Sequence, residues 1–102
     1  MSELKTADEV VTRTKKKLKP PNQYKVLLHN DDYTTMEFVV YILQFVFHKS
    51  PSEATQIMLR VHENGTGICG VYSYEIAETK VAAVHDLAEQ YEFPLKSSME
   101  EA

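Results

Sequence analysis

Residues 38–47 read Phe-Val-Val-Tyr-Ile-Leu-Gln-Phe-Val-Phe, and this almost wholly apolar segment constrains the fold more than any other part of the chain. A helix that is apolar on nearly all sides must be buried in a core. The segment is much shorter than the ~20 residues that a transmembrane helix needs, so we expect it inside a globular domain. A chain of 102 residues has room for one such domain.

Capping signals place this segment in a helix over residues 36–48 and predict a second helix after it. Thr34-Thr35-Met36-Glu37 has the capping-box pattern, so the first helix should begin near Thr35. Ser50-Pro51-Ser52-Glu53 repeats the pattern with proline at the first helical position, and Gly65 is a C-terminal stop. The second helix carries five residues at helical spacing: Ala54, Ile57, Met58, Val61 and His62.

Three strands and a third helix complete the predicted domain, which spans residues 23–102. Strands are expected over residues 24–29, 68–72 and 91–98, and Pro94 should place the last one at an edge. Ser73 can cap the third helix. The order β-α-α-β-α-β predicts an α+β fold, in which a small antiparallel three-stranded sheet packs on three helices.

The charge of the chain is unevenly distributed. Residues 1–22 carry six Lys or Arg against three Asp or Glu, a net charge of +3, so the total of −4 leaves −7 for residues 23–102. The first segment has few large apolar residues, and we expect a flexible tail. An acidic domain is a poor partner for nucleic acid and accommodates a cationic or amine-bearing partner more easily. An acidic surface that only aids solubility is an equally good interpretation.

Catalysis, cofactors and metals are poorly supported. Cys69 lies in an apolar strand pattern, where cysteines are usually inert, and the chain has no nucleophile elbow and no phosphate-binding loop. Asp31 and Asp32 could share a metal with a histidine, but the spacing matches no zinc or calcium motif. A single cysteine, no secretory signal pattern and no membrane-spanning run predict a cytoplasmic protein without membrane association.

The junction Asn30-Asp31-Asp32, between the first strand and the first helix, suggests a ligand. Met58 and His62 are four residues apart and share one helix face, which places an imidazole at the rim of an apolar patch. If the junction folds over this helix, Asn30, Asp31 and His62 could together accept hydrogen bonds from a primary ammonium. From the residues alone, a simple Asx turn and a surface histidine remain the favoured interpretation.

The chain resembles the bacterial ClpS adaptor family over residues 20–95. The resemblance is carried by several dense motifs in order: Tyr24-Lys25-Val26, Asn30-Asp31-Asp32-Tyr33-Thr34, Met36-Glu37-Phe38-Val39, Ala54-Thr55-Gln56-Ile57-Met58-Leu59, Val61-His62, Gly65, Ile68-Cys69-Gly70-Val71 and Glu75-Ile76-Ala77-Glu78-Thr79-Lys80-Val81. One departure is Thr35, where the family usually has proline.

The resemblance implies a non-catalytic adaptor of the N-end rule pathway. Such proteins bind substrates that begin with Leu, Phe, Tyr or Trp and deliver them to ClpA, the hexameric unfoldase of the ClpAP protease. By position, Asn30, Asp31 and His62 are expected to bind the substrate α-amine, with Asp32 and Thr34 at the mouth of the pocket. The expected apolar walls are Met36, Val39, Met58, Val61 and Leu95, and Met36 would act as a gate against β-branched first residues.

Glu75 and Lys80 are similar to the family's contact surface for the unfoldase N-domain, and the tail would enter the unfoldase during delivery. Two alternatives remain open. One is a domain that docks on the unfoldase only to redirect its substrate choice and keeps a vestigial pocket. The other is a small metal-dependent enzyme.

Overall fold

The computed structural model describes residues 22–102, so the expected tail lies, except for its last residue, outside the described residues. The elements follow the predicted order: β1 (Gln23–His29), α2 (Met36–Phe45), α3 (Pro51–Asn64), β2 (Thr66–Ser73), α4 (Tyr74–Gln90) and β3 (Lys96–Glu101). The predicted α+β fold of three helices and a three-stranded antiparallel sheet is confirmed. No helix within the described part of the chain is long and apolar enough to span a membrane.

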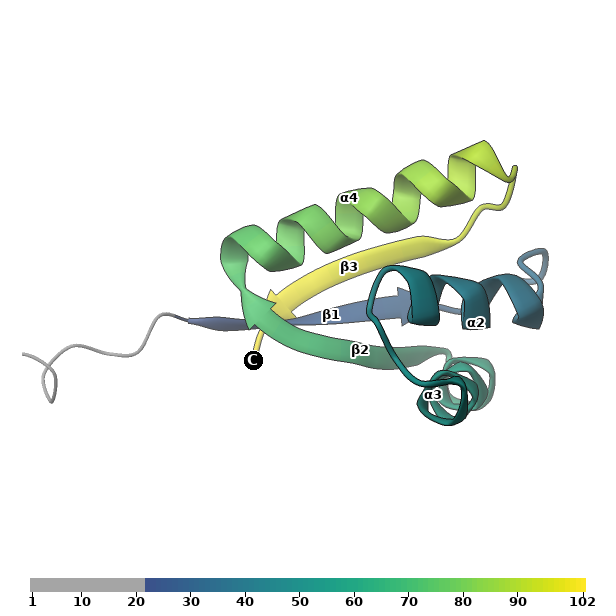
Figure 1. Ribbon diagram of the computed structural model, residues 1–102, viewed down its shortest axis with the longest axis horizontal. Coiled ribbons are helices and arrows are strands. Elements are labelled where there is room, and N and C mark those ends of the chain that lie inside the picture. The colour runs from purple at the N-terminus through teal and green to yellow at the C-terminus, as the bar shows by residue number, and fades with distance from the viewer. Residues whose placement is uncertain (1–21) are drawn as a thin grey trace, which may run out of the picture.

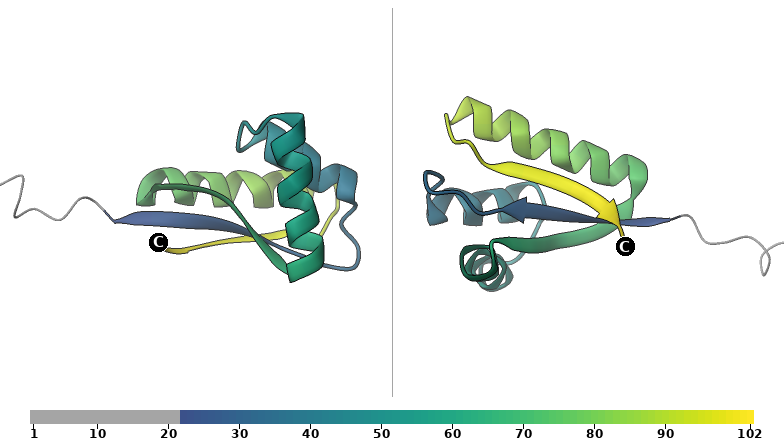
Figure 2. Two further views of the ribbon diagram at one scale, coloured as in Figure 1. Left: turned by 90° about the horizontal axis from the view of Figure 1, so that it is seen from below. Right: turned by 180° about the vertical axis from the view of Figure 1, so that it is seen from behind.

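The sheet is built around β1, which pairs antiparallel with β2 on one side and β3 on the other. Val26 and Leu28 on β1 are fully buried in the core. In Figure 1, α4 runs along the sheet, and the left view of Figure 2 shows α3 crossing the strand direction. The α3 helix contacts both α2 and β2, so the segment between β1 and β2 folds into a two-helix unit at one end of the sheet.

The strand β2, which contains Gly67 and Gly70, carries an irregularity in its pairing with β1. Val26 pairs with Gly70 and Leu27 pairs with Ile68, so Cys69 is the extra residue of a β-bulge. Gly67 approaches α3 closely, because a Cβ atom built on it would lie 2.7 Å from Val61 Cγ2.

The helix α2 is shorter than predicted and is capped one residue later. Its N-cap is Thr35, whose hydroxyl oxygen accepts from the Phe38 amide, so Thr34 and Glu37 do not form the expected capping box. Thr35 has φ −73°, which lies within the range that proline imposes. Threonine therefore takes the backbone conformation that proline would have at this position, and its hydroxyl group also caps the helix. The helix ends at Phe45 and not at residue 48, since His48 takes a positive φ of 55°.

The helix α3 follows its sequence signals closely. Ser50 and Glu53 form both hydrogen bonds of a capping box, and Pro51 occupies the first turn. Gly65 ends the helix in the left-handed region at φ 85°, and its amide donates to the Val61 carbonyl. These local signals fix both ends of the helix that carries Met58 and His62.

The last strand, β3, was predicted too early in the chain. Tyr91 is the C-cap of α4, and Glu92 has a positive φ of 63°, so residues 91–95 form a turn and not a strand. The strand itself is Lys96–Glu101, an edge strand as predicted. Its sequence, Lys-Ser-Ser-Met-Glu-Glu, has weak strand propensity, and its pairing with β1 overrides that preference.

Candidate functional site

A cavity of about 240 Å³ opens where the β1–α2 loop meets α2 and α3. Nine of the ten residues predicted for the pocket line it: Asn30, Asp31, Asp32, Thr34, Met36, Val39, Met58, Val61 and His62. The tenth, Leu95, is 3% exposed in the core and is not a lining residue. The structure therefore brings together residues that are up to 32 positions apart in the chain.

The lining changes from polar at the surface to apolar inside. Asn30, Asp32 and His62 are exposed, whereas Val39 and Val61 are 7% and 2% exposed. Met36 stands between these zones at 46% exposure. This arrangement suits a guest with a polar or charged head near the surface and an apolar side chain inside.

Asp31 is held in place by its own loop. One carboxylate oxygen accepts from the amides of Tyr33 (2.8 Å) and Thr34 (2.6 Å), and the other accepts from the Thr34 hydroxyl (2.7 Å). Partial burial alone would raise the pKa of Asp31, but these hydrogen bonds outweigh it and lower the pKa below the ordinary value of 3.8. The carboxylate is thus ionised at neutral pH, and its second oxygen retains a lone pair for a ligand.

This loop is an Asx turn, the simple alternative that the sequence left open. The turn and a ligand-binding role are compatible, because the turn hydrogen bonds fix the carboxylate at the mouth of the cavity. A backbone hydrogen bond of 2.8 Å from the Asn30 amide to the Gly65 carbonyl also ties the loop to the end of α3. His62, in the last turn of α3, is thereby kept on the same rim.

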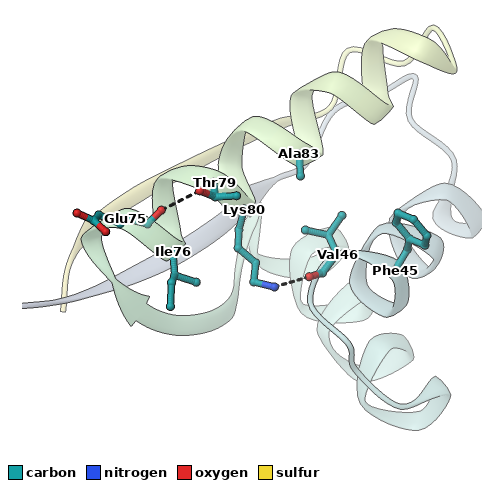
Figure 3. A pocket seen from close by; sticks show the side chains of 7 residues that line it. All are labelled: Phe45, Val46, Glu75, Ile76, Thr79, Lys80 and Ala83. Atoms are coloured by element: carbon teal, nitrogen blue, oxygen red, sulfur yellow. Dashed lines mark hydrogen bonds between the residues drawn. The ribbon is translucent and has the colours of Figure 1, made fainter.

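A second concave surface, here called the α2–α4 groove, lies between the end of α2 and the first turns of α4. Figure 3 shows its lining residues: Phe45, Val46, Glu75, Ile76, Thr79, Lys80 and Ala83. The groove encloses about 510 Å³ and contains both residues predicted to contact the unfoldase. Lys80 reaches across it and donates to the Val46 carbonyl at 2.7 Å, so this lysine also caps the end of α2.

Sequence reasoning did not predict the apolar part of this groove. Phe45 and Ile76 are 59% and 50% exposed and line the same groove, so two large apolar side chains are exposed together on one concave surface. Phe45 was counted as part of a buried helix, and only the packing of α2 against α3 shows which side of that helix faces outward. A signal was available in the apolar residue Ile76 between the charged residues Glu75 and Glu78.

The cysteine and the metal-ligating side chains considered from the sequence can be located among the described residues. Cys69 is buried, and desolvation raises the pKa of its thiol to about 12, so it is a poor nucleophile. Residues 22–102 contain no group of three or more His, Cys, Asp or Glu side chains placed to hold a metal ion.

Comparison with known families gives a match over nearly the whole domain. The sequence model described as "ATP-dependent Clp protease adaptor protein ClpS" matches residues 19–98. The chain belongs to the ClpS family. The family is one of protease adaptors, which agrees with the expectation of a chain that is not itself an enzyme.

Curated ClpS relatives are similar over most of their length. The ATP-dependent Clp protease adapter protein ClpS of Phenylobacterium zucineum is 54% identical, and the alignment covers 98% of both chains. The ClpS of Caulobacter vibrioides is 58% identical over 91 residues, which cover 89% of this chain and 84% of the relative. Among solved structures, Agrobacterium tumefaciens ClpS2 bound to L-phenylalaninamide matches with a TM-score of 0.79 and 38% identity, and the match covers 81% of this chain and all of that one.

Proposed function

We propose that the cavity binds the free α-amino group and the large apolar side chain of a substrate's N-terminal residue, namely Leu, Phe, Tyr or Trp. The observation that carries this proposal is the graded lining, with Asn30, Asp31 and His62 at the rim and Val39 and Val61 inside. The pocket so proposed comprises the nine lining residues, with Leu95 left in the core.

The chemistry of a free N-terminus matches this lining. An ammonium group has three donors, and an amide oxygen, a carboxylate and a neutral imidazole nitrogen are three acceptors for them. Charge-assisted hydrogen bonds of this kind contribute about 1.5–3 kcal/mol each. Burial of a Leu- or Phe-sized side chain adds about 1.5–3 kcal/mol.

The solved relative supports the same class of ligand. Phenylalaninamide, which is bound to Agrobacterium tumefaciens ClpS2, carries a free α-amine and an aromatic side chain on one small molecule. It therefore resembles the first residue of a peptide. The flexible side chains of Met36 and Met58 suit a pocket that takes aliphatic and aromatic guests, because methionine repacks with little strain.

The test is fluorescence anisotropy with three labelled peptides: one beginning with Leu, its N-acetylated twin, and a version beginning with Val. We expect only the free-amine Leu peptide to bind. Acetylation removes the charge and adds bulk, and Val is branched at Cβ where Met36 narrows the entrance. Equal binding of all three peptides, or no binding, would remove the pocket assignment and favour the alternative of a docking domain with a vestigial pocket.

We further propose that the α2–α4 groove, with Glu75 and Lys80, docks on the N-domain of ClpA and that the chain delivers its bound substrate to ClpAP. A large groove with exposed Phe45 and Ile76 beside charged side chains has the composition of a protein interface.

Deletion of residues 1–18 should leave peptide binding intact and stop degradation of a Leu-first substrate by ClpAP. Normal degradation with the truncated chain would refute a role of the tail in delivery.

A further inference from the structure

Thr35 joins the β1–α2 loop to the helix that begins with Met36. Thr35 is the N-cap of α2, and its hydroxyl oxygen accepts from the Phe38 amide at 3.1 Å. Its carbonyl oxygen accepts from the Val39 amide, also at 3.1 Å. Thr34 before it and Met36 after it both line the cavity, whereas Thr35 does not. Two residues of the cavity wall are therefore connected through a residue that lies outside the wall.

The chain is held in place on both sides of this connection. On the loop side, Thr34 donates from its amide and its hydroxyl group to the Asp31 carboxylate, at 2.6 and 2.7 Å. On the helix side, Phe38 and Val39 are buried in the core. Between these fixed points lie three exposed residues, 35–37. The two hydrogen bonds of the N-cap close this short segment into the first turn of α2.

The position of Met36 depends on that first turn. The first amides of a helix have no partner within the helix, so a side-chain cap stabilises the turn that they belong to. Without the Thr35 oxygen, the Phe38 amide loses its acceptor, and only the Val39 bond still closes the turn. Met36 is the first residue of the turn, and its side chain is 46% exposed, so unwinding would move it with little loss of packing.

We propose that the Thr35 hydroxyl group holds the Met36 gate in place and thereby sets how strongly the pocket rejects β-branched first residues. Thr35 is a positioning residue, because it acts through the backbone of Met36 and does not line the cavity. A closed first turn keeps Met36 at one place in the entrance, whereas an open turn lets it move and admits Val or Ile. This inference rests on the proposed function and adds a determinant of its selectivity.

The test compares full-length Thr35→Val with the wild type. Valine has nearly the shape of threonine but no oxygen that could accept from the Phe38 amide. Free-amine peptides that begin with Leu or Val compete with a labelled Leu-first peptide, so weak binding of the Val-first peptide is also measured. We expect the ratio of the Val to the Leu dissociation constant to fall about fivefold, which is the usual effect of a lost N-cap. Thr35→Ser keeps the oxygen and should retain the wild-type ratio.

Ser50→Ala is the matched control. It removes the side-chain cap of α3, the other helix of the cavity, and Ser50 does not line the cavity. It should cost a similar amount of stability and leave the ratio unchanged. An equal fall of the ratio in Ser50→Ala and Thr35→Val would show a general effect of lost stability, which overturns the inference.

A double-mutant cycle shows whether Thr35 acts through Met36. In a Met36→Ala background the gate side chain is absent, so adding Thr35→Val should not change the ratio further. A wild-type ratio in folded Thr35→Val would overturn the inference, and so would the same change in both backgrounds. Binding of neither free-amine peptide by the wild type would instead overturn the proposed function, and this inference with it.

Amide hydrogen exchange tests the cap without any peptide. The Phe38 amide should exchange about fivefold faster in Thr35→Val than in the wild type and Thr35→Ser, because its acceptor is lost. Equal exchange rates in all three proteins would show that the Thr35 oxygen does not hold the first turn in solution, which overturns the inference even where peptide binding is as proposed.

Discussion

The amide of Asn30 donates a hydrogen bond of 2.8 Å to the carbonyl of Gly65, and this bond joins the two halves of the cavity rim. Asn30 begins the loop that carries Asp31, and Gly65 ends the helix that carries His62. Gly65 presents its carbonyl in this direction from a left-handed conformation with φ 85°. The rim therefore depends on Gly65, which ends α3, as well as on the side chains proposed to bind the amine.

Gly65→Ala should lower the free energy of unfolding by about 1 kcal/mol, because only glycine takes a left-handed conformation without strain. No atom lies within 4 Å of a Cβ at this position, so the cost is one of backbone conformation and not of collision. Binding of the Leu-first peptide should weaken severalfold as the rim loosens. Gly65→Asn should recover most of both losses in urea titration and anisotropy, and an alanine variant as stable as the wild type would contradict the prediction.

Asp31→Asn separates the charge of the loop from its shape. The amide oxygen of Asn can still accept from the Tyr33 and Thr34 amides, which keeps the turn, but the negative charge is lost. We expect Asp31→Ala to abolish measurable binding of the Leu-first peptide, and Asp31→Asn to weaken it about a hundredfold with little change in unfolding. Asp86→Ala, on α4 and outside the cavity, is the matched control. Unchanged affinity in both Asp31 variants would disprove the amine assignment.

Met36→Ala should admit peptides that begin with Val or Ile. Met36 is the first residue of α2, is 46% exposed and lines the cavity, so its removal widens the entrance where Cβ branches need room. Affinity for Val-first peptides should rise about tenfold, and affinity for the Leu-first peptide should fall because buried area is lost. Continued rejection of both β-branched residues would place the gate elsewhere. Met99→Ala, which alters a methionine on β3 that does not line the cavity, should leave the preference unchanged.

Lys80→Met should destabilise the domain by about 1 kcal/mol, because the Val46 carbonyl loses its donor at the end of α2. The ammonium group also lies 5.4 Å from the centroid of the Tyr72 ring. Urea unfolding measures the loss, with the exposed Lys96→Met as control. An unchanged midpoint would show that the Lys80–Val46 bond contributes nothing in solution. Glu75→Gln, whose change is confined to the surface, is therefore the cleaner test of unfoldase docking.

Cys69 should resist alkylation in the native protein. Desolvation raises the pKa of its thiol to about 12, so at pH 8 almost no reactive thiolate is present, and burial at 1% exposure blocks the reagent. Mass spectrometry after iodoacetamide treatment should find the thiol unmodified without denaturant and fully modified in guanidinium chloride. Rapid modification of the native protein would show that the β2 bulge opens on the timescale of the reaction.

Local signals in the sequence determined the elements whose ends are fixed by hydrogen bonds between neighbours in the chain. Ser50, Glu53 and Gly65 define α3 because a capping box and a left-handed stop act within a few residues. The end of α2 could not be predicted in this way, because the carbonyl of its C-cap residue, Val46, accepts a hydrogen bond from Lys80, 34 positions away. The strand β3 was misplaced for the same reason, since its partner is β1 and not a neighbour in sequence.

The sequence by itself determined the α+β fold, the family motifs and the residue types that gather around the cavity. Only the tertiary structure decided which of these residues share it, because the cavity lies between a loop and two helices whose spacing is set by packing. That packing places Val61 against Gly67, buries Leu95 in the core and turns Phe45 outward into the α2–α4 groove. Periodicity shows which side of an element is apolar, and capping shows where a helix begins and ends. The distance between two elements instead follows from the side chains at their contact.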